Sequence, residues 1–422
     1  MPVIYRYSQS RDRHNVKPNF RIHKIMLLFL LFVLLALFIS IQLLWITAKG
    51  TPKLYNLSNI ELGSDTELVW PDNGQASVGT FGAGIIKSKP QPQKSAPIAS
   101  MAKVITALAI LDKHPLQLGD KGPTITFDTI DEQIYRDYLS KNGSVTAVTA
   151  GKSMSYYEAL QAMLLPSSNN MTDSLVRRVF GSIDNYVIYA NKMIDNFGLK
   201  NTHIFDASGF SSKTTSTPDD MISIGQKALS NPVITEIMSQ SSANIPLAGH
   251  IENFNHLLGV DNVTGGKTGN TDEAGWCLLS IIQKSPKEDS VISVIMGMNT
   301  PNELYLSARK LLASTSELFR DIKLVNNGDI VGDYFVPWLN KSIKLVAKKD
   351  LIIKHQQIKK LGSSRVITDS NPPFRKGQEI GIITFTNNPT LKVPIAVAEE
   401  IPPPTLFWRA RTILSFYEPS YR

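Results

Sequence analysis

A run of 23 residues without a charged side chain, Ile25 to Thr47, is the feature that most constrains this chain. At a rise of about 1.5 Å per residue, a helix of this length crosses a hydrocarbon layer of about 30 Å. The 24 residues before it carry six basic side chains and one acidic side chain. This bias predicts that the amino end stays in the cytoplasm and that the rest of the chain is exported. We therefore predict an uncleaved, single-pass signal anchor in the cytoplasmic membrane. A cleaved signal peptide is the alternative, although its apolar core usually has only about 7 to 15 residues.

Charge and cysteine content exclude several classes of function. Most of the net charge of +8 lies in the amino-terminal segment, so we do not expect a nucleic-acid partner. The single Cys277 allows neither an intramolecular disulfide nor a Cys-rich zinc site. The seven histidines show no His-Glu-x-x-His pattern, and we expect neither a metal nor another cofactor. The sequence does not indicate an oligomeric state.

Hydrophobic periodicity places the main elements of the exported chain. Small and β-branched residues predict one strand over 76–86, and an apolar helix begins at about Ser100. A capping box, Ser155 to Glu158, starts a second helix that ends before Pro166, and a third helix begins near Asn170. Two neighbouring buried strands are expected at 277–283 and 291–298, followed by a helix over 308–319.

Beyond about Ile322 the pattern changes to alternation, which predicts a small β domain with strands at 380–386 and 391–397. Residues 405–417 then place their apolar side chains on one helical face. Such a face can lie in a membrane interface or pack on the β domain, and amphipathicity alone does not choose between the two.

Ser100 and Lys103 form a Ser-x-x-Lys pattern at the start of the first exported helix. Residues three apart on a helix share a face, so the amine can take the hydroxyl proton if burial lowers the pKa of the lysine. The pattern alone is weak, because Ser307 to Lys310 also satisfies it.

Two further patterns follow at larger spacing. Lys267-Thr268-Gly269 precedes a buried strand and occurs once, and Asn270 follows it. Its lysine and its hydroxyl could bind a carboxylate. The alternative interpretation is that the segment forms a tight turn in which the lysine is only solvated. Ser167 and Asn169 lie in an inter-helix loop, where such residues usually cap helices. Specificity comes from the order of the three patterns, 67 and then 100 residues apart.

The segments PIASMAKVITALAIL, AMLLPSSNNMTDSLV and GGKTGNTDEAGWC together resemble the active-site blocks of the low-molecular-mass penicillin-binding proteins, the serine D-alanyl-D-alanine carboxypeptidases. The resemblance implies an α/β (α+β) serine β-lactamase-like domain with a five-stranded antiparallel sheet and a helical subdomain, followed by a small β domain and a membrane-associated tail. The expected organisation is a cytoplasmic tail (1–24), the anchor (25–47), a linker (48–65), the peptidase domain (66–322), the β domain (323–401) and an amphipathic tail (402–422).

The resemblance also implies roles for individual residues. Ser100 would attack the bond between the last two D-alanines of a peptidoglycan stem peptide, and Lys103 would take its proton. Ser167 would relay a proton to the leaving amine, Asn169 would hold the substrate amide, and the remaining binding residues would be Lys267, Thr268, Gly269 and Asn270. The amides of Ser100 and Asn270 would form the oxyanion hole. β-Lactam antibiotics would then be covalent inhibitors. Many relatives have His at the position of Asn270, and some have Arg where this chain offers Phe254.

The leading hypothesis is therefore a serine D-alanyl-D-alanine carboxypeptidase that acts in cell-wall biosynthesis and remodelling. An endopeptidase that cuts D-alanine cross-links would use the same acyl-enzyme step. A β-lactamase is disfavoured because no additional glutamate base stands out near Ser167. A weakly catalytic, membrane-anchored scaffold that binds wall peptides is the alternative from a different class.

Overall fold

The structure, a computed structural model, describes residues 20–45, 49–55, 68–354, 361–368 and 371–416. These residues divide into two compact units. The first is Leu62–Asp321, described from residue 68 onward. The second combines the described residues before position 56 with Ile322–Ile353 and the described residues after position 360.

The first unit contains a five-stranded sheet in the order β10-β11-β12-β2-β3, in which every neighbouring pair is antiparallel. Its strands are β10 (Gly265–Thr271), β11 (Gly275–Ile282), β12 (Val291–Met298), β2 (Gln75–Thr80) and β3 (Gly84–Ser88). The five-stranded antiparallel sheet expected from the resemblance is thus confirmed. β11 and β12 pair as neighbours, as the two apolar runs predicted.

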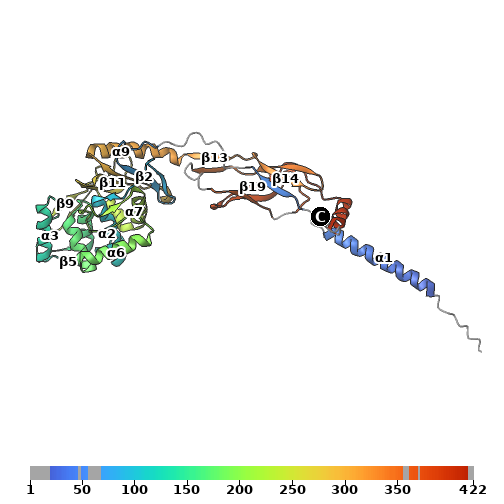
Figure 1. Cartoon of the computed structure of the whole chain (residues 1–422), viewed down its shortest axis with the longest axis horizontal. Coiled ribbons are helices and arrows are strands. Elements are labelled where there is room, and N and C mark those ends of the chain that lie inside the picture. Colours follow the sequence, from blue (N-terminus) through green and yellow to red (C-terminus); the bar gives the residue numbers. More distant parts are fainter. Residues whose placement is uncertain (1–19, 46–48, 56–67, 355–360, 369–370, 417–422) are drawn as a thin grey trace, which may run out of the picture. The chain divides into compact units, whose positions relative to one another are not determined.

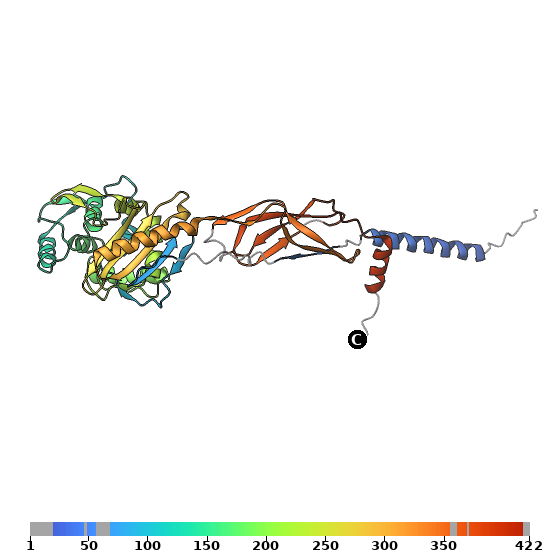
Figure 2. The ribbon, with the colours of Figure 1, turned by 90° about the horizontal axis from the view of Figure 1, so that it is seen from above.

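Alternate residues of the central strands pack on opposite faces of this sheet, because successive strand side chains point to opposite sides. On β12, Ile292 and Val294 join the core that contains the buried side chains of α7 (Pro218–Ser230), whereas Ile295 joins the core under α9 (Pro301–Ser314). The two helices therefore cover opposite faces of the sheet (Figure 1). Figure 2 shows α9 lying across the strands.

A helical subdomain completes the first unit around the buried helix α2. Its helices are α2 (Ala102–Lys113), α3 (Thr129–Ser140), α4 (Tyr156–Leu164), α5 (Asn169–Phe180), α6 (Ile183–Asn196) and α8 (Pro232–Ser239). Short strands connect these elements as the pairs β4 (Ala96–Pro97) with β7 (Thr215–Ser216), β5 (Thr124–Thr126) with β6 (Ser153–Ser155), and β8 (Ser242–Ile245) with β9 (Gly249–Glu252). The capping box predicted at Ser155 and Glu158 is confirmed at the start of α4.

The second unit contains a six-stranded sheet in the order β1-β14-β15-β19-β18-β17. Its strands are β1 (Thr51–Leu54), β14 (Ile330–Val336), β15 (Lys341–Ala347), β19 (Asn388–Val397), β18 (Glu379–Phe385) and β17 (Ser364–Ile367). β13 (Asp321–Val325) pairs with β16 (Leu351–Lys354) beside it. The two strands predicted near 380–386 and 391–397 are β18 and β19, which pair with each other.

Two expectations from the sequence are corrected. The single strand expected over 76–86 is a hairpin of β2 and β3, because the chain turns at Phe81–Ala83 and Gly84 adopts a φ of +70°. The second corrected expectation is the linker over residues 48–65. Thr51–Leu54 form β1 and pair with β14 in the six-stranded sheet. These four residues are too few to show a hydrophobic period, and a partner far away in the sequence decides their structure.

Two helices carry the residues expected at the membrane. The first, α1, spans Phe20–Trp45, and its segment Lys24–Ile41 has a mean hydropathy of 2.9 with no buried side chain. Among the described residues α1 is the one helix long and apolar enough to cross a membrane, a property that signal sequences share. The second, α10 (Leu406–Phe416), has exposed Leu406 and Phe407, while Trp408 meets Trp338 with ring centroids 5.9 Å apart. Position 417 of the predicted tail helix and residues 46 and 47 of the apolar run lie outside the described residues.

Candidate active site

Ser100 and Lys103 meet at the buried start of α2. Ser100 lies in the short 3₁₀ turn η2 (Ala99–Met101) that leads directly into α2, and Lys103 is the second residue of α2. The Lys103 side chain is fully buried, and its Nζ lies 2.8 Å from the Ser100 Oγ. The preceding residue, Ala99, has a φ of +45°, an unusual conformation for a non-glycine residue. Strained backbone of this kind is often found where a catalytic side chain must be held in a fixed direction.

Two glycines allow other segments to pack directly on this turn. A Cβ atom on Gly269 of β10 would lie 2.8 Å from the Ser100 amide nitrogen and 3.0 Å from the Ile98 carbonyl oxygen. A Cβ on Gly209 would lie 1.9 Å from the Ala99 carbonyl oxygen. Other backbone segments can therefore approach the turn that carries Ser100 only because these positions lack a side chain.

The loop between α4 and α5 brings the Ser167–Asn169 segment to the same place. Ser168 acts as the helix cap that sequence reasoning expects of such residues, because its side chain accepts a hydrogen bond from the Met171 amide. Its two neighbours turn toward the lysines instead. The Asn169 Oδ1 accepts a hydrogen bond from Lys103 Nζ at 2.7 Å, and Ser167, which has a φ of +63°, accepts one from Lys267 Nζ at 2.9 Å.

The Lys-Thr-Gly segment lies on β10, so the tight-turn alternative is wrong. Among the described strands, β10 is at the edge of the sheet and pairs with β11 alone, and Lys267 is opposite Leu279. Lys267 is 2 % exposed and also donates to the carbonyl of Thr268, so it is not a solvated lysine. Asn270, which directly follows Gly269 on β10, is exposed. The structure thus brings together the residues of all three motifs.

Burial changes the proton affinity of both lysines. Burial lowers the pKa of Lys103 to about 7, against the opposing charges of Asp206 and Asp173. The pKa of Lys267 falls well below its ordinary value because of burial and the nearby charge of Lys103. A lysine with a pKa of about 7 is partly neutral at neutral pH, and its neutral form, 2.8 Å from a hydroxyl, can accept the proton of that hydroxyl. Loss of this proton is what makes a serine nucleophilic.

These residues open onto a cleft of about 400 Å³. Its wall includes residues of the three motifs and others that sequence reasoning did not select, namely Asn142, Ser144, His256, Trp276 and Tyr305. The His256 and Tyr305 rings meet edge to face with centroids 5.7 Å apart. Phe254, which stands where some relatives have Arg, also lines the cleft. These residues come from separate loops, from strand β11 and from helix α9, and no local pattern marks them.

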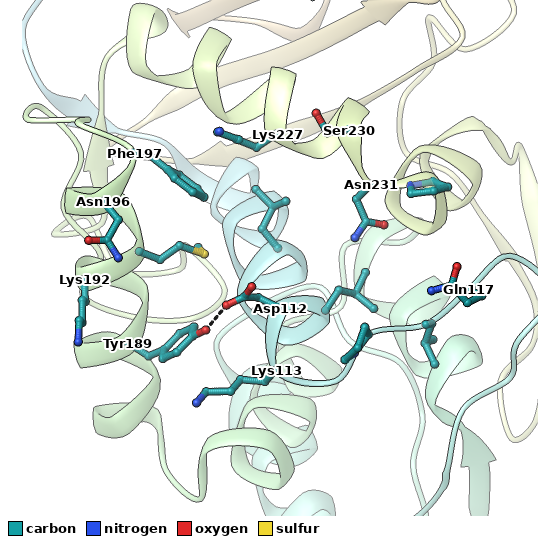
Figure 3. Close-up of a pocket in the computed structure, with 16 residues that line it drawn as sticks. Asp112, Lys113, Gln117, Tyr189, Lys192, Asn196, Phe197, Lys227, Ser230 and Asn231 are labelled. Carbon is teal, nitrogen blue, oxygen red and sulfur yellow. Dashed lines mark hydrogen bonds between the residues drawn. The ribbon is translucent and has the colours of Figure 1, made fainter.

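A larger cavity, of about 780 Å³, lies at the other end of α2 (Figure 3). Leu108, Leu111, Asp112 and Lys113 of α2 line it, and Figure 3 shows the hydrogen bond from Tyr189 to Asp112 across it. Ser100 and Asp112 are roughly 18 Å apart along the axis of α2, at a rise of about 1.5 Å per residue. None of the motif residues lines this cavity.

The second Ser-x-x-Lys pattern gives a useful contrast. Ser307 and Lys310 lie on α9, where Lys310 is exposed. Exposure leaves the Lys310 amine in contact with water, whereas the Lys103 amine is fully buried. Burial of the lysine therefore distinguishes the two copies of the pattern. In the part of the chain that the structure describes, no group of three or more His, Cys, Asp or Glu side chains is placed to hold a metal ion.

The fold and the site define an enzyme class in which a lysine activates a serine for acyl transfer. Residues 82–300 match the family model described as D-alanyl-D-alanine carboxypeptidase, which is more than half of the chain. The chain belongs to this D-alanyl-D-alanine carboxypeptidase family, and the resemblance drawn from the motifs is confirmed.

Individual relatives agree with this assignment. The chain is 25 % identical to the D-alanyl-D-alanine carboxypeptidase DacF of Bacillus subtilis over 75 % of this chain and 82 % of that protein. It is 26 % identical to a D-alanyl-D-alanine endopeptidase of Pseudomonas aeruginosa, over 60 % of this chain and 79 % of that protein. The crystal structure of penicillin-binding protein 5 from Haemophilus influenzae shares the fold, with a TM-score of 0.56 and 22 % identity over 81 % of this chain and 99 % of that one.

Proposed function

We propose that this protein is a serine-type D-alanyl-D-alanine carboxypeptidase that removes the terminal D-alanine from peptidoglycan stem pentapeptides through an acyl-enzyme on Ser100. The single observation that carries the proposal is the fully buried Lys103 amine, 2.8 Å from the Ser100 hydroxyl. Family membership supports the reaction class, and the contacts between Ser100, Lys103, Ser167 and Lys267 support the roles proposed for them.

In acylation, Ser100 Oγ forms a bond to the carbonyl carbon of the penultimate D-alanine as its proton passes to Lys103 Nζ. The backbone amides of Ser100 and Asn270 would stabilise the oxyanion, and the β10 backbone passes close to Ser100 at Gly269. When the C–N bond breaks, Ser167 would relay the proton that Lys103 took from Ser100 to the departing D-alanine amine. Ser167 lies in the same site and accepts a hydrogen bond from Lys267.

Substrate binding would use the edge of the five-stranded sheet. An extended peptide can add as a strand beside β10, whose outer edge carries no neighbouring strand in the described sheet. Lys267 and Thr268 would then face the terminal carboxylate, and the Asn169 amide would hold the substrate amide. Water attacks the resulting ester, releases the shortened peptide and restores the Ser100 hydroxyl. A β-lactam carries a comparable acyl group and would form the same ester.

Labelling with a fluorescent penicillin tests this proposal. The wild-type protein should become covalently labelled, and mass spectrometry should find the acyl group on the peptide that contains Ser100. Ser100→Ala should remain unlabelled, whereas Ser307→Ala, in the exposed copy of the motif, should label like the wild type. Labelling of the Ser100→Ala protein would overturn the assignment of the nucleophile.

An endopeptidase is the second candidate, because one relative with 26 % identity carries that name. The two activities share the acyl-enzyme and differ in the leaving group, which is free D-alanine for a carboxypeptidase and a second stem peptide for an endopeptidase. Purified pentapeptide monomers and cross-linked dimers separate them. The carboxypeptidase assignment requires release of D-alanine from the monomers to be the faster reaction.

The proposal includes a location at the outer face of the cytoplasmic membrane. The apolar helix α1 is compatible with an uncleaved anchor, and the exposed apolar residues of α10 are compatible with contact with the membrane interface. Protease treatment of intact spheroplasts should degrade the part of the chain after residue 47. Detection of a mature protein that begins near residue 48 would instead indicate a cleaved signal peptide.

A further inference from the structure

The substrate of the proposed reaction ends in a carboxylate, and the wall of the cleft offers one basic side chain to it. Among the described residues that line the cleft there is no lysine, arginine, aspartate or glutamate, and His256, which is exposed, is the only basic residue. An imidazole has an N–H donor in its neutral form as well as in its charged form. His256 can therefore donate a hydrogen bond to a carboxylate oxygen without first taking up a proton.

Lys267, which the proposed function directs toward the carboxylate, does not line the cleft. It is 2 % exposed, and its amine donates hydrogen bonds of 2.9 Å to the Ser167 hydroxyl and to the Thr268 carbonyl. A charged amine has three N–H donors and a neutral amine has two, so at most one remains for a ligand. Because a carboxylate accepts about four hydrogen bonds, this donor and the Thr268 hydroxyl would leave acceptor positions unsatisfied.

The backbone on both sides of His256 is fixed by asparagine side chains. The amide of Asn255 donates to the Asn253 Oδ1 at 2.9 Å, and the Asn255 Oδ1 accepts a hydrogen bond from the Leu257 amide at 3.2 Å. Asn255 and Leu257 are each 3 % exposed, whereas Phe254 and His256 are exposed and line the cleft. This local backbone therefore directs alternate residues toward the cleft.

Tyr305 of α9 holds the His256 ring in place. The two rings meet edge to face, with centroids 5.7 Å apart and an angle of 74° between the ring planes. The Tyr305 hydroxyl also donates a hydrogen bond of 3.4 Å to the carbonyl of Phe254. A donor that is held in place before the ligand arrives loses less conformational entropy on binding. The imidazole is thus arranged as a preorganised donor at the edge of the cleft.

We propose that His256 is a substrate-binding residue that donates a hydrogen bond to the terminal carboxylate of the stem peptide and favours substrates with a free carboxyl end. The inference rests on the proposed function, because the carboxylate is that of the D-alanine which the reaction removes. His256 takes no part in the transfer of the acyl group to Ser100. It adds a contact to the substrate beside that of Thr268.

The test is the release of D-alanine from diacetyl-Lys-D-Ala-D-Ala by the full-length protein. His256→Phe keeps an aromatic ring beside Tyr305 but removes the N–H donor, whereas His256→Gln removes the ring and keeps an N–H donor. The value of kcat/KM should fall by about 10-fold in His256→Phe, because a hydrogen bond to a charged group is lost. In His256→Gln it should stay within about threefold of the wild type.

A second substrate and a control variant make the result specific. The same peptide with a carboxamide end lacks the charged acceptor, so His256→Phe and His256→Gln should cleave it with values of kcat/KM within about threefold of each other. If the wild type does not cleave the carboxamide, the order of the two variants on the free peptide decides the question. His250→Phe changes an exposed histidine of β9 that does not line the cleft, and it should behave like the wild type on both peptides.

The inference is overturned if His256→Phe is not the more impaired of the two variants on the free peptide. A role of the ring in packing on Tyr305 predicts that reverse order. A tenfold difference between the variants on the carboxamide also overturns it, because the contact would then not be to the carboxylate. The proposed function survives these results as long as the wild type releases D-alanine and is labelled on Ser100. Failure of the wild type in both assays would instead remove the proposed function.

Discussion

Replacing Gly269 by Ala should slow acylation strongly without removing any side chain that takes part in the proposed chemistry. The added Cβ would lie 2.8 Å from the Ser100 amide nitrogen, 3.0 Å from the Ile98 oxygen and 3.1 Å from the Ala99 Cβ. Atoms of this kind normally stay about 3.4 Å or more apart, so β10 and the turn that carries Ser100 must separate by about 0.5 Å. All three neighbours belong to the backbone or to its first side-chain atom, which cannot rotate away.

A misplacement of about 1 Å at a reacting centre costs roughly 100-fold in rate, so a shift of about half that size should reduce the acylation rate constant by about 10-fold or more. Overpacking should also lower the free energy of unfolding by about 1 to 3 kcal/mol. Stopped-flow acylation by a fluorescent penicillin and thermal unfolding measure the two effects. Gly265→Ala is the matched control, because its Cβ would meet Met238 at 3.6 Å, an ordinary contact distance. Equal acylation rates for wild-type and Gly269→Ala protein would refute the close-approach argument.

Three further predictions test other parts of the structure. The acylation rate constant should fall about tenfold per pH unit below about pH 7, because protonation removes the base at Lys103; a rate that is flat from pH 8 to pH 5 would contradict this. Asp131→Ala should lower the free energy of unfolding of the first unit by about 3 kcal/mol in chemical denaturation, because the fully buried Asp131 forms ion pairs with Arg177 and Arg178. The control, Asp137→Ala at an exposed site, should have little effect. A fragment that begins at residue 68 lacks β1 and the hydrogen bond from Gly50 to Tyr334. Its six-stranded sheet should therefore unfold at a lower temperature than that of a fragment that begins at residue 49. Equal unfolding temperatures would show that β1 adds no stability.

Local patterns predicted much of the peptidase unit. The Ser155 capping box, the apolar helix after Ser100 and the paired strands β11 and β12 all depend on short-range periodicity or on a residue at a fixed offset. Elements that depend on distant partners were not predictable in this way. The sequence predicts a single strand where the structure has the β2–β3 hairpin. It predicts a linker where β1 pairs with β14, almost 280 residues later in the chain.

The sequence by itself determined which side chains are available for the proposed reaction. Ser100, Ser167 and Lys267 can be identified from their motifs and from the order of these motifs along the chain. Only the tertiary structure decided what these side chains can do. Burial of Lys103, rather than its spacing from Ser100, lowers the pKa of the amine, whereas the same spacing on α9 leaves Lys310 exposed to water. The physical reason is that desolvation depends on all the atoms that surround a charge, and those atoms come from α2, α5, β10 and the loop at Ser208, which are neighbours only in the folded chain.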